Sequence, residues 1–171
     1  MNQVLISLVE IARLRRDPSV LPASIVLLAI MAAAYAGSSA LQSWLLYSND
    51  RLLARTAADL ALTLATFWLV LAVTRRLYRY RQTMNAVLGT SVLLTPLLVL
   101  LIALQQPAGM YYPIKLAAWA ASIAVIVWYT LIVGHILKSA LEIGFVTSIA
   151  IAITTVIAGN AVLGKLFPGA A

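Results

Sequence analysis

The first candidate for chemistry is Asp59, a carboxylate about two turns into the apolar run 52–73. Ionisable side chains inside a membrane are costly, and those found there commonly carry protons or cations. A proton or cation site at Asp59 is therefore one hypothesis. The structural alternative is an ion pair with Arg55, which precedes Asp59 by four residues and so shares its helix face. The spacing favours the ion pair.

A second titratable cluster, His135, Lys138 and Glu142, follows the fourth long apolar run. Histidine titrates near neutral pH, so a proton-sensitive switch is one hypothesis. A structural alternative explains more of the residues. Cations are favourable at a helix C-terminus, and Ser139 followed three residues later by Glu142 fits the capping box that begins a helix. The sequence favours the structural alternative.

The densest basic segment is RRLYRYR, in which tyrosines are interleaved with four arginines. These arginines are candidate contacts for anionic lipid headgroups or a protein partner: Arg75, Arg76, Arg79 and Arg81. Each basic residue near an anionic membrane contributes about 1 kcal/mol. Nucleic acid is not an expected partner, because a short loop offers no groove or stacking platform.

Other chemistry has little support in the sequence. Cysteine is absent and there is one histidine, which excludes thiol nucleophiles and multi-histidine metal sites. Phosphate-binding loops, dinucleotide fingerprints and metalloprotease helices are absent as well. We therefore expect no enzymatic activity and no cofactor. Asp59 and His135 are expected near opposite faces of the membrane, which argues against a shared catalytic site acting on lipid.

The elements that position these residues follow from composition. Of the 171 residues, 63% are hydrophobic and 10% are charged, whereas a soluble domain has about 45–50% and about 25%. A water-soluble globular domain is therefore excluded. About 20 apolar residues of helix cross the hydrocarbon core. The prediction is a single all-α membrane domain with five transmembrane helices, at residues 21–47, 52–73, 84–104, 114–137 and 141–164.

Residues 1–16 precede the first span and carry apolar residues at roughly helical spacing. The segment is too short to cross, so it predicts an amphipathic helix lying at the membrane interface. Its arginines follow the apolar stretch, whereas those of a signal peptide precede it, so we expect the segment to be retained. Pro96 lies inside the third span and predicts a kink there.

Uncharged polar residues are spread through the spans. They are able to hydrogen-bond between helices or to line a polar path, but their scatter along the sequence defines no path. The six are Gln82, Asn85, Thr95, Thr154, Thr155 and Asn160.

The positions of lysine and arginine predict the orientation, because cytoplasmic loops carry an excess of both. If the N-terminus is inside, the cytoplasmic side holds eight of the twelve. These are Arg13, Arg15, Arg16, Arg75, Arg76, Arg79, Arg81 and Lys138. We therefore expect a cytoplasmic N-terminus and a C-terminus on the periplasmic or extracellular side.

Two segments, YRYRQTMNAVLGTSVLLTPLL (Tyr78–Leu98) and, more loosely, WYTLIVGHILKSALEIG (Trp128–Gly144), carry a family resemblance. Together with the five spans, they resemble small bacterial members of the Yip1-like membrane proteins. The resemblance implies a multi-pass protein of the bacterial inner membrane that works by binding partners. Eukaryotic members act in vesicle traffic with small GTPases. The resemblance supplies no catalytic residues.

Short loops and the lack of a convergent polar site favour a non-enzymatic adaptor or structural partner in a membrane assembly. Its contacts would be the lipid bilayer and another membrane protein or a second copy of itself. The alternative is a small transporter, channel component or lipid-handling protein, motivated by Pro96, Asp59 and His135. A cavity between the spans lined by such residues would favour the alternative, and a dry, alanine-packed interior would count against it.

Overall fold

The computed structural model describes residues 2–46, 51–106 and 111–167, and every regular element in these ranges is a helix. The helices are α1 (Asn2–Ala12), η1 (Pro18–Val20), α2 (Ile25–Leu46), α3 (Leu52–Val73), η3 (Leu77–Arg79), α4 (Tyr80–Gln105), α5 (Tyr112–Leu141) and α6 (Phe145–Leu166). Five of them, α2 to α6, are long and apolar enough to cross a membrane. The predicted all-α membrane fold is confirmed. Residues 1 and 47, which bound two predicted segments, and the C-terminal residue lie outside the described residues.

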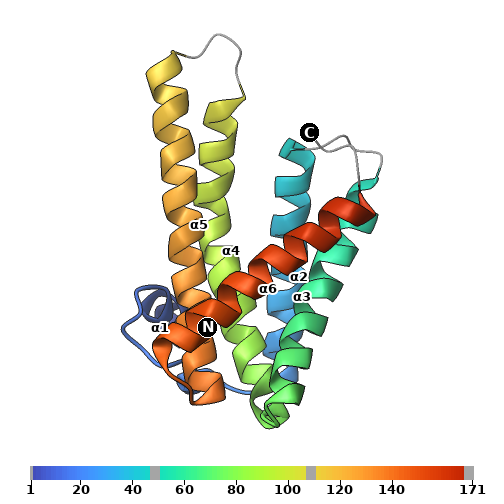
Figure 1. Cartoon of the computed structure of the whole chain (residues 1–171), viewed down its shortest axis with the longest axis vertical. Coiled ribbons are helices and arrows are strands. Elements are labelled where there is room, and N and C mark those ends of the chain that lie inside the picture. Colours follow the sequence, from blue (N-terminus) through green and yellow to red (C-terminus); the bar gives the residue numbers. More distant parts are fainter. Residues whose placement is uncertain (1, 47–50, 107–110, 168–171) are drawn as a thin grey trace.

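The centre of the bundle is α4, which packs against α2 and against α5. Figure 1 shows α4 and α5 side by side as one pair, with α2 and α3 as another and α6 crossing them obliquely. In the first half of α4, eight consecutive residues, 83–90, are buried. The helix is therefore enclosed on all sides at this level. It continues through Pro96 as one element to Gln105.

The expected short N-terminal helix is present as α1, and one of its faces packs into the bundle. Leu8 and Ile11 are fully buried, and α1 contacts both α4 and α5. A Cβ at Gly89 of α4 would lie 2.6 Å from a methyl of Leu8, so the Leu8 side chain would have to shift to admit a larger residue there. Leu5 and Ile6 remain exposed on the other side of α1, where lipid can cover them.

Side chains of α4 also explain why the chain before α2 is not helical. Gln82 donates to the carbonyl oxygens of Ser19 and Leu21, and Asn85 Nδ2 donates to that of Pro22 at 2.9 Å. These interactions use carbonyls that a helix would bond internally. As a result α2 begins at Ile25, four residues later than predicted.

The turn between the last two spans also differs from the prediction. Ser139 and Glu142 were expected to form a capping box, but α5 continues to Leu141 and α6 begins at Phe145. Glu142 ends α5 in the left-handed conformation, at φ 55° and ψ 43°. Its carboxylate binds two arginines, and the Ser139 hydroxyl donates to Asp17. Neither side chain is therefore left to cap α6.

Many large apolar side chains on the long helices are exposed. The buried share of the most apolar part of each span ranges from 6% in the first to 33% in the third. Exposed side chains include Val26, Leu53, Trp68, Trp119 and Val146. Apolar surface on this scale needs a non-aqueous cover, so the bilayer completes the fold.

Candidate functional site

Asp59 is the eighth residue of α3, about 10 Å along the helix from its first residue. Its Oδ2 accepts hydrogen bonds from two hydroxyls of α2, Ser39 Oγ at 2.6 Å and Tyr35 Oη at 3.0 Å. Tyr35 Oη also lies 3.4 Å from Thr63 Oγ1, one turn further along α3. The carboxylate is thus held between two transmembrane helices by a chain of hydroxyl groups. The predicted ion pair with Arg55 stays a prediction.

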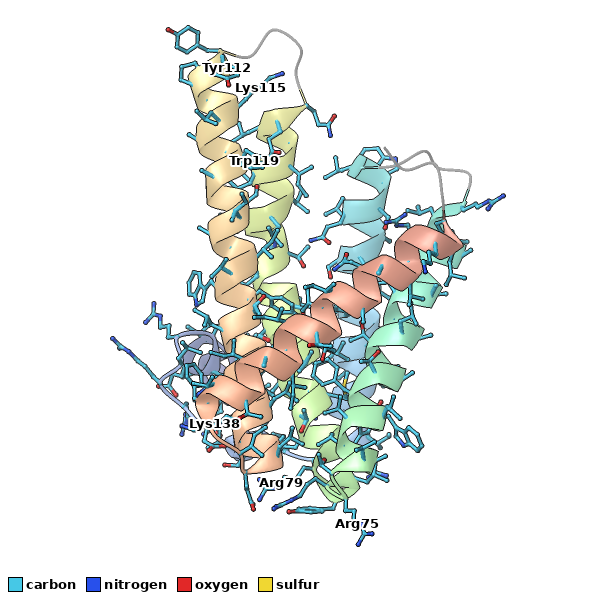
Figure 2. All side chains as sticks on the ribbon, viewed as in Figure 1. Arg75, Arg79, Tyr112, Lys115, Trp119 and Lys138 are labelled. Carbon is cyan, nitrogen blue, oxygen red and sulfur yellow. The ribbon has the colours of Figure 1, made fainter. Side chains whose placement is uncertain are left out.

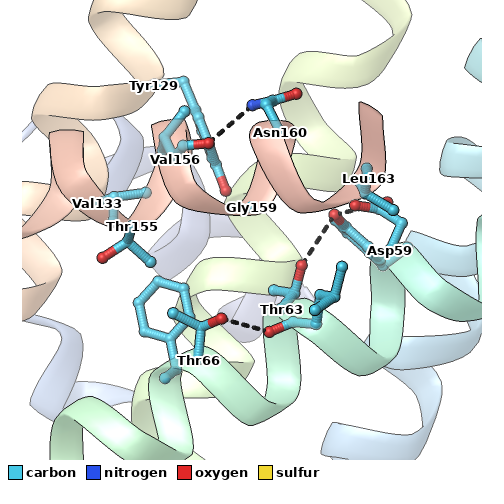
Figure 3. Close-up of a pocket in the computed structure, with 13 residues that line it drawn as sticks. Asp59, Thr63, Thr66, Tyr129, Val133, Thr155, Val156, Gly159, Asn160 and Leu163 are labelled. Atoms are coloured by element: carbon cyan, nitrogen blue, oxygen red, sulfur yellow. Dashed lines mark hydrogen bonds between the residues drawn. The ribbon is translucent and has the colours of Figure 1, made fainter. Parts of the chain in front are cut away.

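Two cavities of about 120 Å³ each meet at this carboxylate, because Tyr35, Asp59 and Tyr129 line both. The first, the α2–α4 cavity, is also lined by Ser38, Ser39, Gln42, Ser91, Leu94, Thr95 and Leu98. The second, the α3–α6 cavity, is also lined by Leu62, Thr63, Thr66, Phe67, Val133, Thr155, Val156, Gly159, Asn160 and Leu163 (Figure 3). Tyr129 of α5 is paired with α4, since the Ser91 hydroxyl donates to its Oη at 2.9 Å.

Polar residues reach these cavities because each helix carries them on one face. On α2 they stand at positions i, i+3, i+4 and i+7, a spacing that places them in one stripe: Tyr35, Ser38, Ser39 and Gln42. On α3 the corresponding stripe is Thr56, Asp59, Thr63 and Thr66. Sequence reasoning missed the α2 residues because it weighed polar groups along the chain rather than helix face by helix face. The stripes themselves were the available signal.

The six polar residues singled out from the sequence separate into three groups. Thr95 lines the α2–α4 cavity, while Thr155 and Asn160 line the α3–α6 cavity. Thr154 is exposed on α6. Gln82 and Asn85 hold the segment before α2. Half of the set therefore converges on the Asp59 cavities, although its sequence positions gave no indication of this.

Among the residues that the structure describes, Asp59 is the single carboxylate that lines either cavity, and no lysine or arginine lines them. The remaining polar lining consists of hydroxyl and amide groups. Carboxylate, hydroxyl and carbonyl oxygens are ligands for hard cations, and the same groups hydrogen-bond polar solutes. Thr56 Oγ1, three residues before Asp59, is buried with no hydrogen-bond partner within the described ranges.

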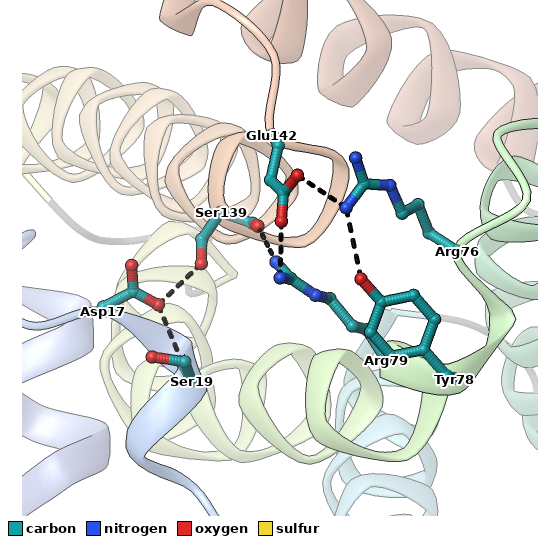
Figure 4. A network of polar contacts seen from close by, with 7 residues as sticks. All are labelled: Asp17, Ser19, Arg76, Tyr78, Arg79, Ser139 and Glu142. Carbon is teal, nitrogen blue, oxygen red and sulfur yellow. Dashed lines mark hydrogen bonds and ion pairs between the residues drawn. The ribbon is translucent and has the colours of Figure 1, made fainter.

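Four of the other predicted residues, Arg76, Arg79, His135 and Glu142, gather at one end of the bundle. We call this cluster the basic junction (Asp17, Ser19, Arg76, Arg79, His135, Ser139 and Glu142). Figure 4 shows its members apart from His135. Arg76 and Arg79 each approach the Glu142 carboxylate at 2.6 Å, and Arg79 also donates to the Ser139 carbonyl oxygen at 2.6 Å. The hydrogen bond from Arg76, together with the charges of both guanidinium groups, lowers the pKa of Glu142. The junction therefore joins the α3–α4 and α5–α6 turns.

The junction also fixes the segment that follows α1. Asp17 Oδ1 accepts from the Ser139 hydroxyl at 2.6 Å and from the Ser19 backbone N–H at 2.8 Å. Burial alone would raise the pKa of Asp17, but these hydrogen bonds outweigh burial and lower it. His135 Nε2 donates to the Arg16 carbonyl oxygen at 3.1 Å. His135 therefore also contacts the segment that follows α1.

Several predicted site residues lie apart from one another in the structure. Arg75 and Arg81 are exposed and lie apart from the ion pairs of the junction. His135 lines a depression of about 470 Å³ at the junction, whereas Asp59 lines the two intramembrane cavities. The two side chains thus form no common site. In the part of the chain that the structure describes, no group of three or more His, Cys, Asp or Glu could hold a metal ion.

The junction depression is electrically balanced. Its lining holds two cations, Arg79 and Lys138, and two carboxylates, Asp17 and Glu142. Such a lining does not select an anion or a cation, whereas the described lining of the Asp59 cavities carries one acidic group and no basic one. The Asp59 cavities are therefore the stronger candidate site. No family model, curated protein or solved structure matches this chain.

Proposed function

We propose that this chain binds a small polar solute inside the bilayer and passes it between its two cavities, as a small transporter or channel component. The proposal rests on one observation: two polar cavities of about 120 Å³ share the residues Tyr35, Asp59 and Tyr129. A protein that only holds other proteins together has no need of a polar cavity around an ionisable group. This observation favours the small transporter or channel component, which the sequence analysis gave as the alternative to an adaptor.

The dimensions set the class of solute. A water molecule occupies roughly 30 Å³ in the liquid, so each cavity has room for a few waters or a solute of a few heavy atoms. Tyr35, Asp59 and Tyr129 would form the narrow step between the cavities, because they belong to both linings. A solute that moves from one cavity to the other would exchange hydrogen bonds with these three side chains.

Flux into proteoliposomes tests the proposal. Purified protein would be reconstituted, and entry of Na⁺, K⁺, protons and glycerol would be compared with protein-free vesicles. At least one solute should enter faster, and Asp59→Asn should slow it by about tenfold or more, as expected for loss of a charged hydrogen-bond partner. Thr155 lines the α3–α6 cavity, so Thr155→Ala should alter the flux. Its neighbour Thr154 is exposed, so Thr154→Ala should leave the flux unchanged. Wild-type flux no faster than that of empty vesicles, for every solute, would refute the proposal.

The orientation is part of the same proposal: a bacterial inner-membrane protein whose N-terminus and basic junction face the cytoplasm. Supporting it, Arg75, Arg79 and Lys138 lie at one end of the bundle and Lys115 at the other (Figure 2). The native chain has no cysteine, so a thiol reagent would label the chain only at a cysteine that is introduced. A membrane-impermeant maleimide should label Lys115→Cys in intact cells and Arg81→Cys only after lysis. The reverse pattern would invert the orientation.

A second candidate function is the adaptor role, which one observation favours. Arg76 and Arg79 are paired with Glu142 in the junction, while Arg75 and Arg81, close to them in the sequence, are exposed and outside these ion pairs. A fixed basic surface suits an acidic segment of a membrane partner, and the Yip1-like resemblance points the same way. Crosslinking in native membranes should recover a stoichiometric partner from wild type, and less of it from the Arg75→Gln/Arg81→Gln variant. Equal recovery from both would exclude this surface.

A further inference from the structure

We propose that the depression at the basic junction binds the headgroup of a zwitterionic phospholipid with a primary amine, such as phosphatidylethanolamine. Lys138 would bind the phosphate and Asp17 the ammonium group. The depression is separate from the Asp59 cavities, so this inference does not depend on the proposed transport. The observations that carry it are the pairing of charges in the junction, the hydrogen bonds that position Lys138 and Asp17, and the exposed apolar side chains beside the depression.

The pairing of charges in the junction leaves one cation and one carboxylate of the depression available. Arg79 and Glu142, which line it, approach each other at 2.6 Å, and Arg76 approaches the same carboxylate at 2.6 Å. Lys138 and Asp17 line the depression as well, yet neither belongs to a salt bridge within the described residues. A positive and a negative group that border one space without pairing suit a ligand that carries both charges.

Hydrogen bonds between α5 and the segment after α1 position these two groups. His135 Nε2 donates to the Arg16 carbonyl oxygen at 3.1 Å. One turn later on α5, the Ser139 hydroxyl donates to Asp17 Oδ1 at 2.6 Å. Lys138 directly precedes Ser139 in the same helix. The contacts that hold Asp17 against α5 therefore also place it near Lys138, on the border of one depression.

The acceptor capacity of Asp17 favours a primary ammonium group. Its Oδ1 accepts from the Ser139 hydroxyl and from the Ser19 backbone N–H (Figure 4). An ionised carboxylate can accept about four hydrogen bonds, so Asp17 retains capacity for the N–H groups of an ammonium ligand. Charge-assisted hydrogen bonds of this kind are roughly twice as strong as those between neutral groups. A choline headgroup has no N–H to donate, and a glycerol headgroup has no positive charge.

Apolar side chains beside the depression favour a lipid over a water-soluble zwitterion. The depression has a volume of about 470 Å³ and is also lined by Ile143. Lys138 Nζ lies 6.0 Å from the centre of the Phe145 ring, at the start of α6. Phe145 and its neighbour Val146 are exposed, and exposed apolar surface needs a non-aqueous cover. The acyl chains of a lipid whose headgroup occupies the depression would cover these side chains.

Native mass spectrometry tests the inference by comparing lipids that differ only in their headgroups. Purified protein in mild detergent would be titrated with dioleoyl phosphatidylethanolamine, phosphatidylcholine or phosphatidylglycerol, and a Kd obtained for each. Wild type should bind phosphatidylethanolamine about tenfold more tightly than the other two, as expected for one hydrogen bond to a charged group. Equal affinity for all three lipids would overturn the proposal. Tightest binding of phosphatidylglycerol would also overturn it, because that result indicates a site for anionic lipid.

Two variants test the two halves of the headgroup. Asp17→Asn keeps an oxygen for Ser139 but loses the charge, so the preference for phosphatidylethanolamine over phosphatidylcholine should disappear. Lys138→Gln should weaken the binding of all three lipids by about tenfold, because each carries a phosphate. Lys115→Gln removes the same charge at the other end of the bundle and should leave every Kd unchanged (Figure 2). If Asp17→Asn fails to fold, Lys138→Gln carries the test, since Lys138 is exposed. A Kd for phosphatidylethanolamine that is equal in Lys138→Gln and wild type would refute the site.

Glycerophosphoethanolamine separates a lipid from a soluble ligand, because it has the same headgroup without acyl chains. It should bind at least about tenfold more weakly than the lipid, since it leaves the exposed side chains of α6 uncovered. Weaker binding of this size would support a membrane lipid as the ligand. Equal affinity for the two compounds would refute it and indicate a water-soluble zwitterion.

Discussion

Replacing Gly134 with alanine tests the helix contact that places α6 over its cavity. Gly134 of α5 is buried, and an added Cβ would lie 2.8 Å from Cγ1 and 3.2 Å from Cα of Ile149 on α6. Non-bonded carbon atoms prefer a separation of about 3.5–4.0 Å. Rotation of the Ile149 side chain can relieve the first contact. The second involves backbone, so α6 itself must move by a few tenths of an ångström.

The magnitude follows from two opposing contributions. Overpacking of this kind costs about 1–3 kcal/mol, and alanine is more favourable than glycine within a helix by about 1 kcal/mol. Gly37→Ala in α2 is the matched control, because no atom of the described residues lies within 4 Å of its added Cβ. The control should gain the stability that alanine gives a helix relative to glycine, without the steric contact with Ile149. The two variants should therefore differ in free energy of unfolding by about 1–3 kcal/mol.

Thermal unfolding in detergent, followed by circular dichroism, measures this difference. For a chain of this length, each kcal/mol shifts Tm by roughly 2–4 °C, so Gly134→Ala should melt roughly 2–12 °C below Gly37→Ala. Because α6 carries Thr155 and Asn160 into the α3–α6 cavity, flux should change in Gly134→Ala as well. A melting temperature equal to that of Gly37→Ala would show that α5 and α6 do not approach this closely.

Two further predictions concern the elements around the cavities. Leu8→Ala should destabilise the protein by about 2–5 kcal/mol, as expected for truncation of a fully buried leucine. Leu5 is exposed, so Leu5→Ala should cost much less. Equal melting temperatures of the two variants would mean that α1 does not pack into the bundle. The pKa of Glu142 is lowered in the folded protein, chiefly by Arg76, so its ion pairs stabilise the fold above the ordinary carboxyl pKa and are lost as pH falls through the lowered value. At neutral pH the melting temperature of wild type should therefore exceed that of Glu142→Gln, and in acid the two should converge. A difference in melting temperature that stays constant with pH would contradict the lowered pKa of Glu142.

The surroundings of Asp59 changed the preferred function from an adaptor to a small transporter or channel component. From the sequence, Asp59 had a partner four residues away on its own helix and a position near the membrane surface, both of which favoured a structural role. In the structure its carboxylate accepts hydrogen bonds from Ser39 and Tyr35, which belong to α2 and lie 20 and 24 residues away. These contacts between helices could not be read from spacing along one helix.

The sequence by itself determined the class of fold and the number of spans. Its apolar runs match the thickness of a bilayer, and a chain in lipid must satisfy its backbone internally, so five helices follow from length and composition. The same reasoning gathered the arginines of RRLYRYR and Lys138 at one end, because alternate loops lie on the same side of a membrane. The segment before the first span was also expected to be helical, as α1 is.

Only the tertiary structure decided which faces of the helices meet. Hydropathy does not distinguish a helix side that faces lipid from one that faces protein, since both are apolar. Hence the burial of Leu8 beside Gly89 and the convergence of Tyr35, Asp59 and Tyr129 depend on helix rotation and packing, which a single sequence does not specify. Glu142 is the local counterpart: its spacing from Ser139 suited a helix cap, but the two arginines that reach it come from a turn more than 60 residues away and draw it into the junction.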